Sequence, residues 1–315
     1  MSAISRQQRV KGQNYLDEAA ATLSKKTWFA SSTEQKNEEA AELYEKAANA
    51  FKVASAMDDA GAAYVQAAAL YQDKLKNVGE ASKCLSKAGA CYKKTNPVEA
   101  IAAYRSSISL LCDAGRLTQA AKLSKEVAEI FENEEGSGEE EANHIILAIE
   151  SYEQAAELFE MEQQKSQSNQ CLAKVAELRS AALEPPDLLR AAEIYDDLGR
   201  HCLDSNLLKF NAKGYFLQCV ICHLANGDSI GASQAMQRVE SMDYTFGESR
   251  EGKFSTDLVS SVENFDSESF ATACFEFDRI SKLDPWKTTM LVKVKRSIDG
   301  GQGVGDELED DVDLT

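Results

Sequence analysis

The segment EEAAELYEKAANAF, residues 38–51, carries the pattern that decides the fold. The small residue Ala40 is followed four positions later by Tyr44 and four further on by Ala48, and the bulky Phe51 closes the segment. Residues spaced in this way share one face of an α-helix. Small side chains on that face let a second helix approach closely, and bulky ones fill the space between the two. The segment therefore predicts one helix of about three to four turns.

The same pattern returns in register along the chain. The further copies are DDAGAAYVQAAALY (58–71), GEASKCLSKAGACY (79–92), VEAIAAYRSSISLL (98–111) and TQAAKLSKEVAEIF (118–131). The anchor alanines Ala40, Ala60, Ala81, Ala100 and Ala120 are 20, 21, 19 and 20 residues apart. Two copies make a helical hairpin of roughly 40 residues, close to the tetratricopeptide (TPR) period. The sequence therefore predicts an all-α, TPR-like right-handed solenoid of helical hairpins.

The repeats define three predicted regions. The polar, Gly-containing stretch 132–142 predicts a loop, after which the pattern resumes at 146–159, 169–178, 189–202 and 212–225. From about Ala232 onward the register dissolves into shorter apolar runs, which are typical of a helical bundle. We therefore expect helical hairpins over residues 1–229, with a hydrophobic loop at 24–33. A C-terminal helical bundle over 230–298 and a flexible acidic tail over 299–315 would follow.

The end of the chain, LDPWKTTMLVKVKRSI (283–298), has the signals of a capped helix. Asp284 can cap the first N–H groups, and Pro285 fits the first helical position. One apolar face is expected, formed by Leu283, Trp286, Met290, Val294 and Ile298. Gly300 and Gly301 should end the helix. The tail beyond has seven acidic residues and no Lys or Arg from 299 to 315, so we expect it to be presented to a partner protein.

Charge and composition narrow the functional class. A net charge of −18 argues against nonspecific binding to nucleic acid. Without the tail, 34 basic and 45 acidic residues give −11, which leaves room for a local basic face. No apolar run approaches the roughly 18 residues of a membrane-spanning helix, and the N-terminus lacks the apolar stretch of a signal peptide. We therefore expect a cytosolic protein whose eight cysteines are reduced.

The sequence offers little for catalysis. Only three histidines are present, and no nucleotide-binding or hydrolase motif occurs. The segment CVICH (219–223) matches the haem-attachment pattern C-x-x-C-H. It also continues a helical repeat, and a buried helix is the favoured interpretation because haem attachment requires export. A single C-x-x-C pair does not complete a zinc site. The sequence thus predicts a binding protein that is not an enzyme and has no cofactor or metal.

Seven basic residues are candidates for a partner-binding face, although their spacing alone is that of ordinary solvated charges. Lys122 and Lys174 come from the first turns of different repeat helices, so a solenoid could align them on one concave face. Such a face would suit an acidic rod-like partner. The seven residues are Arg116, Lys122, Lys174, Lys209, Lys213, Arg250 and Lys253.

The adjacent residues Trp28 and Phe29 lie in a polar stretch beside Lys25 and Lys26. Two interpretations stay open. The aromatic pair could pack beneath its own loop. Alternatively, the pair could enter the interface of a bilayer, where aromatic rings suit the headgroup level and the lysines would meet anionic lipids.

Several of these stretches are similar to the soluble NSF attachment proteins, the alpha-SNAP family. The resemblance runs along nearly the whole chain and is carried by AAELYEKAANAFK (40–52), AGACYKKTNPVEAI (88–101), DAGRLTQAAK (113–122), AIESYEQAAELF (148–159), DSNLLKFNAKGYF (204–216), FGESREGK (246–253), ISKLDPWKTTMLVKVKRSI (280–298) and the acidic end. It implies a twisted sheet of helical hairpins with a C-terminal bundle. It also implies an adaptor in vesicle-mediated transport, including transport between the ER and the Golgi.

The family binds SNARE complexes, four-helix bundles that include syntaxin-type SNAREs, at the cytosolic face of membranes. It recruits and stimulates the AAA ATPase called N-ethylmaleimide-sensitive factor (NSF), which disassembles these complexes. The resemblance implies a cytoplasmic, peripheral membrane protein that does not bind nucleic acid. The alternative is a TPR-type co-chaperone or scaffold that clamps acidic peptide termini.

The resemblance also implies roles for particular residues. SNARE binding falls to Lys122, Lys174, Lys213 and Arg250, with Arg116, Lys209 and Lys253 nearby. Gln170 stands where the family often has another lysine. Trp28 and Phe29 correspond to the family's hydrophobic membrane loop. The residues that engage the ATPase are Asp310, Asp311, Asp313 and Leu314, beyond a Gly-rich tether longer than the family usually has.

Overall fold

The structure is a computed structural model that describes residues 2–26, 28–134, 138–205 and 208–300. Within these ranges it is helical and has no strand, which confirms the predicted all-α class. The helices are α1 (Ala3–Ser24), α2 (Ala30–Val53), α3 (Met57–Ala69), α4 (Val78–Tyr92), α5 (Pro97–Asp113), α6 (Leu117–Glu132), α7 (Glu139–Met161), α8 (Lys165–Ala181), α9 (Leu188–Leu203), α10 (Lys209–Ala225), α11 (Ser229–Met242), α12 (Arg250–Glu263), α13 (Ser267–Ile280) and α14 (Pro285–Gly300). A π-helical turn, η1 (Leu70–Lys74), follows α3.

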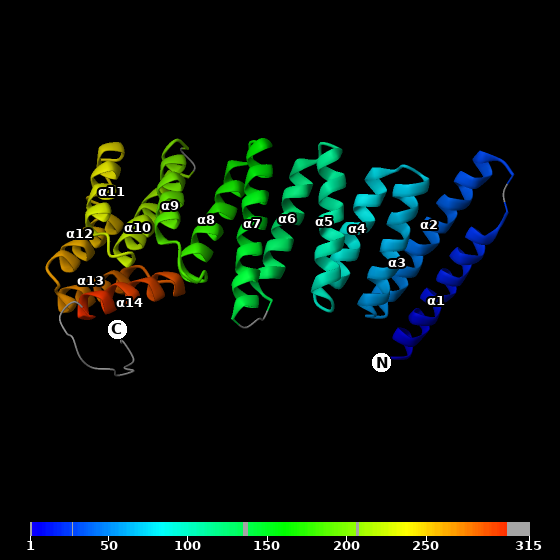
Figure 1. Cartoon of the computed structure of the whole chain (residues 1–315), viewed down its shortest axis with the longest axis horizontal. Coiled ribbons are helices and arrows are strands. Elements are labelled where there is room, and N and C mark those ends of the chain that lie inside the picture. The colour runs from blue at the N-terminus through cyan, green and yellow to red at the C-terminus, as the bar shows by residue number, and fades with distance from the viewer. Residues whose placement is uncertain (1, 27, 135–137, 206–207, 301–315) are drawn as a thin grey trace. The chain divides into compact units, whose positions relative to one another are not determined.

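The chain divides into two compact units, Met1–Ser168 and Asn169–Thr315, called unit 1 and unit 2 below. In unit 1 each helix from α1 to α7 packs against the next one along the chain (Figure 1). The result is the predicted array of TPR-like hairpins. The boundary between the units, at Ser168 and Asn169, reflects the density of contacts within each unit and does not mark where the repeats end. The predicted limit of the repeats at residue 229 therefore stays a prediction.

The anchor alanines of the repeat are all in the core of unit 1. Ala40, Ala60, Ala81, Ala100 and Ala120 are each 0% exposed. A methyl group at these positions lets neighbouring helices approach closely, whereas a longer side chain would hold them apart. These five residues are therefore core residues, as the repeat pattern predicts.

Glycines extend this close packing, because an aromatic ring from a neighbouring helix lies directly against four of them. A β-carbon at these positions would come within 2.3–2.8 Å of a ring atom, closer than side chains pack. The pairs are Gly12 with Phe51, Gly61 with Tyr92, Gly89 with Tyr104, and Gly199 with Phe216. In each pair the missing side chain of one helix provides the space for the ring of the next.

Two predicted loops are shorter in the structure. α7 begins at Glu139, inside the predicted loop 132–142, and three glutamates lie in its first turn. Negative charges near the N-terminus, the positive end of the helix dipole, stabilise a helix, which explains why so polar a stretch is helical. Similarly, α2 begins at Ala30, within the predicted loop 24–33, so Trp28 and Phe29 lie in a shorter connection.

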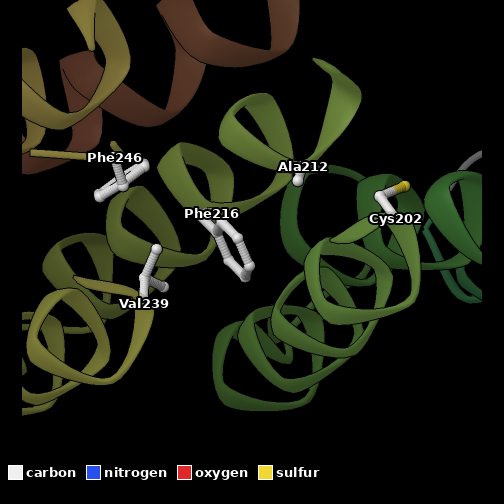
Figure 2. Close-up of a cluster of buried hydrophobic side chains, with 5 residues drawn as sticks. All are labelled: Cys202, Ala212, Phe216, Val239 and Phe246. Atoms are coloured by element: carbon white, nitrogen blue, oxygen red, sulfur yellow. The ribbon is translucent and has the colours of Figure 1, made fainter. Parts of the chain in front are cut away.

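In unit 2, helix α10 is the central element and packs against α9, α11, α12 and α14. Figure 2 shows part of the core on one side of α10, where Phe216 lies near Val239 and Phe246. The rings of Phe216 and Phe246 meet edge to face, with centroids 5.9 Å apart. Such aromatic pairs add stabilisation beyond their buried area.

The last helix, α14, is held by Trp286. The indole Nε1–H donates a hydrogen bond to the buried Ser180 hydroxyl at 2.9 Å, and the ring meets Tyr195 edge to face at 5.5 Å. Asp284 caps the helix through the Lys287 N–H at 2.8 Å, as predicted. The apolar face differs at one position, because Leu291 is buried while Leu283 is only half-buried. α14 therefore packs as a structural element up to Ile298.

The ring-on-glycine contact can be tested with Gly199 and Gly214, which lie in the paired helices α9 and α10. We expect Gly199→Ala to lower the free energy of unfolding by about 1–3 kcal/mol, because the new methyl group collides with the Phe216 ring. Gly214 faces open space, so Gly214→Ala should raise it by about 0.5–1 kcal/mol through better helix propensity. Urea unfolding followed by circular dichroism measures both. Equal effects in the two variants would contradict the ring-packing explanation.

Candidate partner-binding surfaces

The turn before α6 places Arg116 at the surface of unit 1. Gly115 has a φ of +69°, the left-handed conformation that ends many helices. The Arg116 N–H donates to the Leu111 carbonyl at 2.8 Å, and the Gly115 N–H donates to the Cys112 carbonyl at 3.0 Å. This pair of bonds ends α5 and reverses the chain. Arg116 is thereby exposed immediately before the first residue of α6.

Arg116 and Lys122 both line one groove of about 620 Å³ between α4 and α6. Two more lysines line it from α4, Lys83 and Lys87, whereas Glu80 contributes the one carboxylate among its lining residues. The groove is therefore positively charged in a chain whose net charge is strongly negative. Hereafter it is called the α4–α6 groove.

The four cations of the α4–α6 groove differ in how far they are engaged. Lys87 pairs with Glu45 at 2.9 Å and lies 5.2 Å from the centre of the Tyr64 ring. Lys83 pairs with Glu80, one helical turn away, at 3.0 Å. Within the part of the chain that the structure describes, neither Arg116 nor Lys122 has an ion-pair partner. Those two predicted residues are thus the cations most available to a carboxylate from outside.

In unit 2, Lys209 and Lys213 lie one turn apart at the start of α10. The Lys213 ammonium donates to the Thr245 carbonyl at 3.4 Å. Both lysines influence Asp243: burial alone would raise the pKa of its carboxyl, but hydrogen bonds from Thr245 and the two nearby ammonium groups outweigh burial and lower it. The charged Asp243 therefore neutralises part of this basic site.

The remaining predicted cations have acidic neighbours. Lys174 lies 3.1 Å from Glu177, Arg250 lies 3.8 Å from Glu251, and Lys253 lies 3.8 Å from Glu248. Exposed pairs of this kind are weak, about 0.2–1 kcal/mol, so a partner can compete for these residues. Lys122 belongs to unit 1 and Lys174 to unit 2, and their alignment on one face stays a prediction.

Lys83 and Lys87 were not among the residues that the sequence pointed to. The signal for Lys83 was present, since it occupies the same place in its repeat as Lys122 does in a later one. Its significance depends on knowing that α4 and α6 line the same groove.

Trp28 and Phe29 are exposed in the connection between α1 and α2. Trp28 is 92% exposed and Phe29 74%, so neither side chain packs beneath the loop. Lys25 and Lys26 beside them are exposed as well. Two uncovered aromatic rings next to two lysines form a small surface that is apolar and positively charged.

The segment CVICH is a buried part of α10. Cys219 and Cys222 lie in the core, and burial raises the pKa of the Cys219 thiol to about 12. The His223 ring nitrogen Nδ1 lies 3.2 Å from an Asp228 carboxylate oxygen. Among the residues with described positions, no group of three or more His, Cys, Asp or Glu side chains could hold a metal ion. The geometry agrees with the buried-helix interpretation of this motif.

The predicted ATPase-engaging residues Asp310, Asp311, Asp313 and Leu314 lie outside the described residues. None of the helices placed by the structure is long and apolar enough to cross a membrane.

The sequence profile of the family described as "Soluble NSF attachment protein, SNAP" matches residues 10–299. An alpha-soluble NSF attachment protein from Vitis vinifera is 40% identical over 280 residues, covering 89% of this chain and 91% of the relative. A beta-soluble NSF attachment protein from Bos taurus is 40% identical over 85% of this chain and 87% of its own. The human alpha-soluble NSF attachment protein is 39% identical over 85% and 86%.

Stacked helical hairpins with a basic groove and exposed aromatic residues define a helical-repeat binding protein. Its surfaces are suited to holding other proteins. The full-length matches are more specific: the chain belongs to the soluble NSF attachment protein family. The resemblance inferred from the sequence is confirmed.

Proposed function

We propose that this protein is an adaptor that binds assembled SNARE complexes at the cytosolic face of membranes and recruits NSF. It would stimulate NSF to disassemble these complexes during vesicle transport. The observation that carries the proposal is the family match along residues 10–299, with relatives named for attachment to NSF. That match favours an adaptor over a TPR-type co-chaperone that clamps acidic peptide termini. The role assigns no reaction to this chain, because the ATPase hydrolyses ATP.

The basic sites support an electrostatic mode of SNARE binding. The α4–α6 groove presents Arg116 and Lys122, and the start of α10 presents Lys209 and Lys213. An individual exposed charge pair contributes only about 0.2–1 kcal/mol. Useful affinity would therefore come from several contacts, summed over both units and over several copies of the adaptor on one SNARE bundle. Complementary charge would also fix the register of the rod-shaped partner.

The exposed aromatic pair supports a peripheral membrane role. Trp28 and Phe29 are exposed, and the exposed Lys25 and Lys26 beside them could contact anionic headgroups. Aromatic rings favour the interface of a bilayer, and each nearby lysine adds about 1 kcal/mol at a negatively charged surface. Membrane contact would raise the local concentration of the adaptor beside membrane-anchored SNARE complexes.

The acidic tail supports recruitment of the ATPase. Its chemistry, six acidic residues from 306 to 315 with Leu314 next to the end, suits a basic partner surface with an apolar pocket. The tail follows α14, which Trp286 holds within unit 2. α14 would thus act as the fixed base from which the tail reaches NSF.

The SNARE-binding part of the proposal predicts a charge-reversal effect. Lys122→Glu combined with Lys213→Glu should weaken capture of a recombinant SNARE complex at least about tenfold at moderate salt, because two attractive contacts become repulsive. Pull-down or biolayer interferometry measures the loss. Lys46→Glu with Lys282→Glu is the control, since both lysines are exposed and neither is a predicted contact. Equal capture by the test variant and wild type would remove these residues from the binding surface.

The membrane part predicts a difference between two assays. Trp28→Ser with Phe29→Ser should reduce disassembly of liposome-anchored SNARE complexes several-fold and leave disassembly of soluble complexes unchanged. The reason is that only the anchored reaction gains from the bilayer contact. Release of SNARE subunits is followed by fluorescence in both settings. The same loss in both assays would indicate a contact with protein rather than with lipid.

The tail predicts a separation of binding from stimulation. The purified protein should enable NSF to disassemble a SNARE complex with ATP, and Leu314→Ala should retain SNARE capture but lose most of that activity. Leu308→Ala, which removes another leucine of the same tail, is the matched control and should stay active. Normal disassembly by Leu314→Ala would show that Leu314 does not stimulate the ATPase.

A further inference from the structure

The repeat register places Lys83 and Lys122 in equivalent positions. Each follows its anchor alanine, Ala81 or Ala120, by two residues. Both alanines are completely buried, so in each helix the anchor faces the core. Two residue steps of about 100° each place the lysine about 200° around its helix from the anchor, on the outward side.

The α4–α6 groove brings these equivalent positions together. Lys83 and Lys122 both line it, one from each helix, and Arg116 lines it from the turn before α6. The buried Leu111 and the half-buried Leu123 provide apolar surface in the same groove. Cations above an apolar surface suit an acidic side chain whose aliphatic part is also in contact.

Lys83 is available to a partner to a greater degree than its neighbour Lys87. Lys87 is engaged by Glu45 of α2 and by the Tyr64 ring of α3, so it ties three helices together. Lys83 is 56% exposed and pairs with Glu80 on its own helix. An exposed pair three residues apart contributes little, so an incoming carboxylate can replace Glu80 at small cost.

We propose that Lys83 is a further partner-contacting residue, and that it forms a carboxylate-binding site with Arg116 and Lys122 in the α4–α6 groove. The site binds acidic side chains of the SNARE bundle. Lys83 contributes to it from α4, one helical hairpin earlier in the chain than Lys122 on α6. Arg116 can hold a carboxylate through two parallel N–H donors, while the lysines act as point charges. This inference rests on the proposed function and extends the binding surface to α4.

The test compares three charge reversals in the full-length protein against a recombinant SNARE complex. Lys83→Glu should weaken capture about threefold to tenfold at physiological salt, and Lys122→Glu should weaken it as well. Lys83→Gln, which removes the charge but keeps a polar side chain that can donate hydrogen bonds, should have a smaller effect. Lys46→Glu is the matched control, because Lys46 is 54% exposed and pairs with Glu42 on its own helix but does not line the groove. It should bind within about twofold of wild type.

Salt provides an independent readout. The ratio of wild-type to Lys83→Glu affinity should shrink as ionic strength rises from about 0.05 M to about 0.5 M, because screening weakens exposed charge contacts. Unchanged circular dichroism of the variants shows that the helices are intact. A ratio that does not depend on salt would contradict a carboxylate contact.

The outcomes separate this inference from the proposed function. If Lys122→Glu weakens capture and Lys83→Glu behaves like Lys46→Glu, the site at α4 is wrong and the adaptor role stands. If the wild-type protein captures no SNARE complex, the proposed function fails and this inference fails with it. Weakening by Lys83→Glu that clearly exceeds the control supports the site.

Discussion

Close approach between helices is the constraint on which this structure depends. The repeats place the methyl group of an alanine where neighbouring helices come near, and at four glycines an aromatic ring of the next helix fills the space that the missing side chain leaves. The anchor alanines have no exposed surface, and a single added carbon at Gly89 or Gly199 would overlap a ring. Packing of this kind tolerates little change in volume, so it fixes both the distance between helices and their rotation.

That fixed rotation also orders the outer surface. Because the anchors of α4 and α6 are both buried in the core, the residues two positions further along lie on the exposed side of both helices. The repeat that packs the core thereby also places charges in line on the surface, and no interaction between the lysines themselves is needed. Lys83 and Lys122 line the groove from α4 and α6 because core packing positions these two helices.

Much of this organisation could be predicted from the sequence, because the repeat period and the small anchors reflect local helix geometry. The cap at Asp284 and the buried face of α14 were also predictable, although Leu291 rather than Leu283 completes that face. The start of α7 was not predicted, because a polar run of glutamates is typical of a loop and only the helix dipole favours a helix there. The place of Lys83 in a groove was not predictable, since it depends on two helices separated by a third.

The contrasting surroundings of the two tryptophans have a practical consequence. Trp28 is almost fully exposed beside α2, while Trp286 is buried in unit 2 against Tyr195 and Ser180. Since the chain has only these two tryptophans, its intrinsic fluorescence has one component from a side chain in water and one from a side chain in a packed interior. The emission of the first would respond to a change of solvent around the α1–α2 connection. The emission of the second would report on the integrity of the C-terminal helices, so one unlabelled sample carries two local probes.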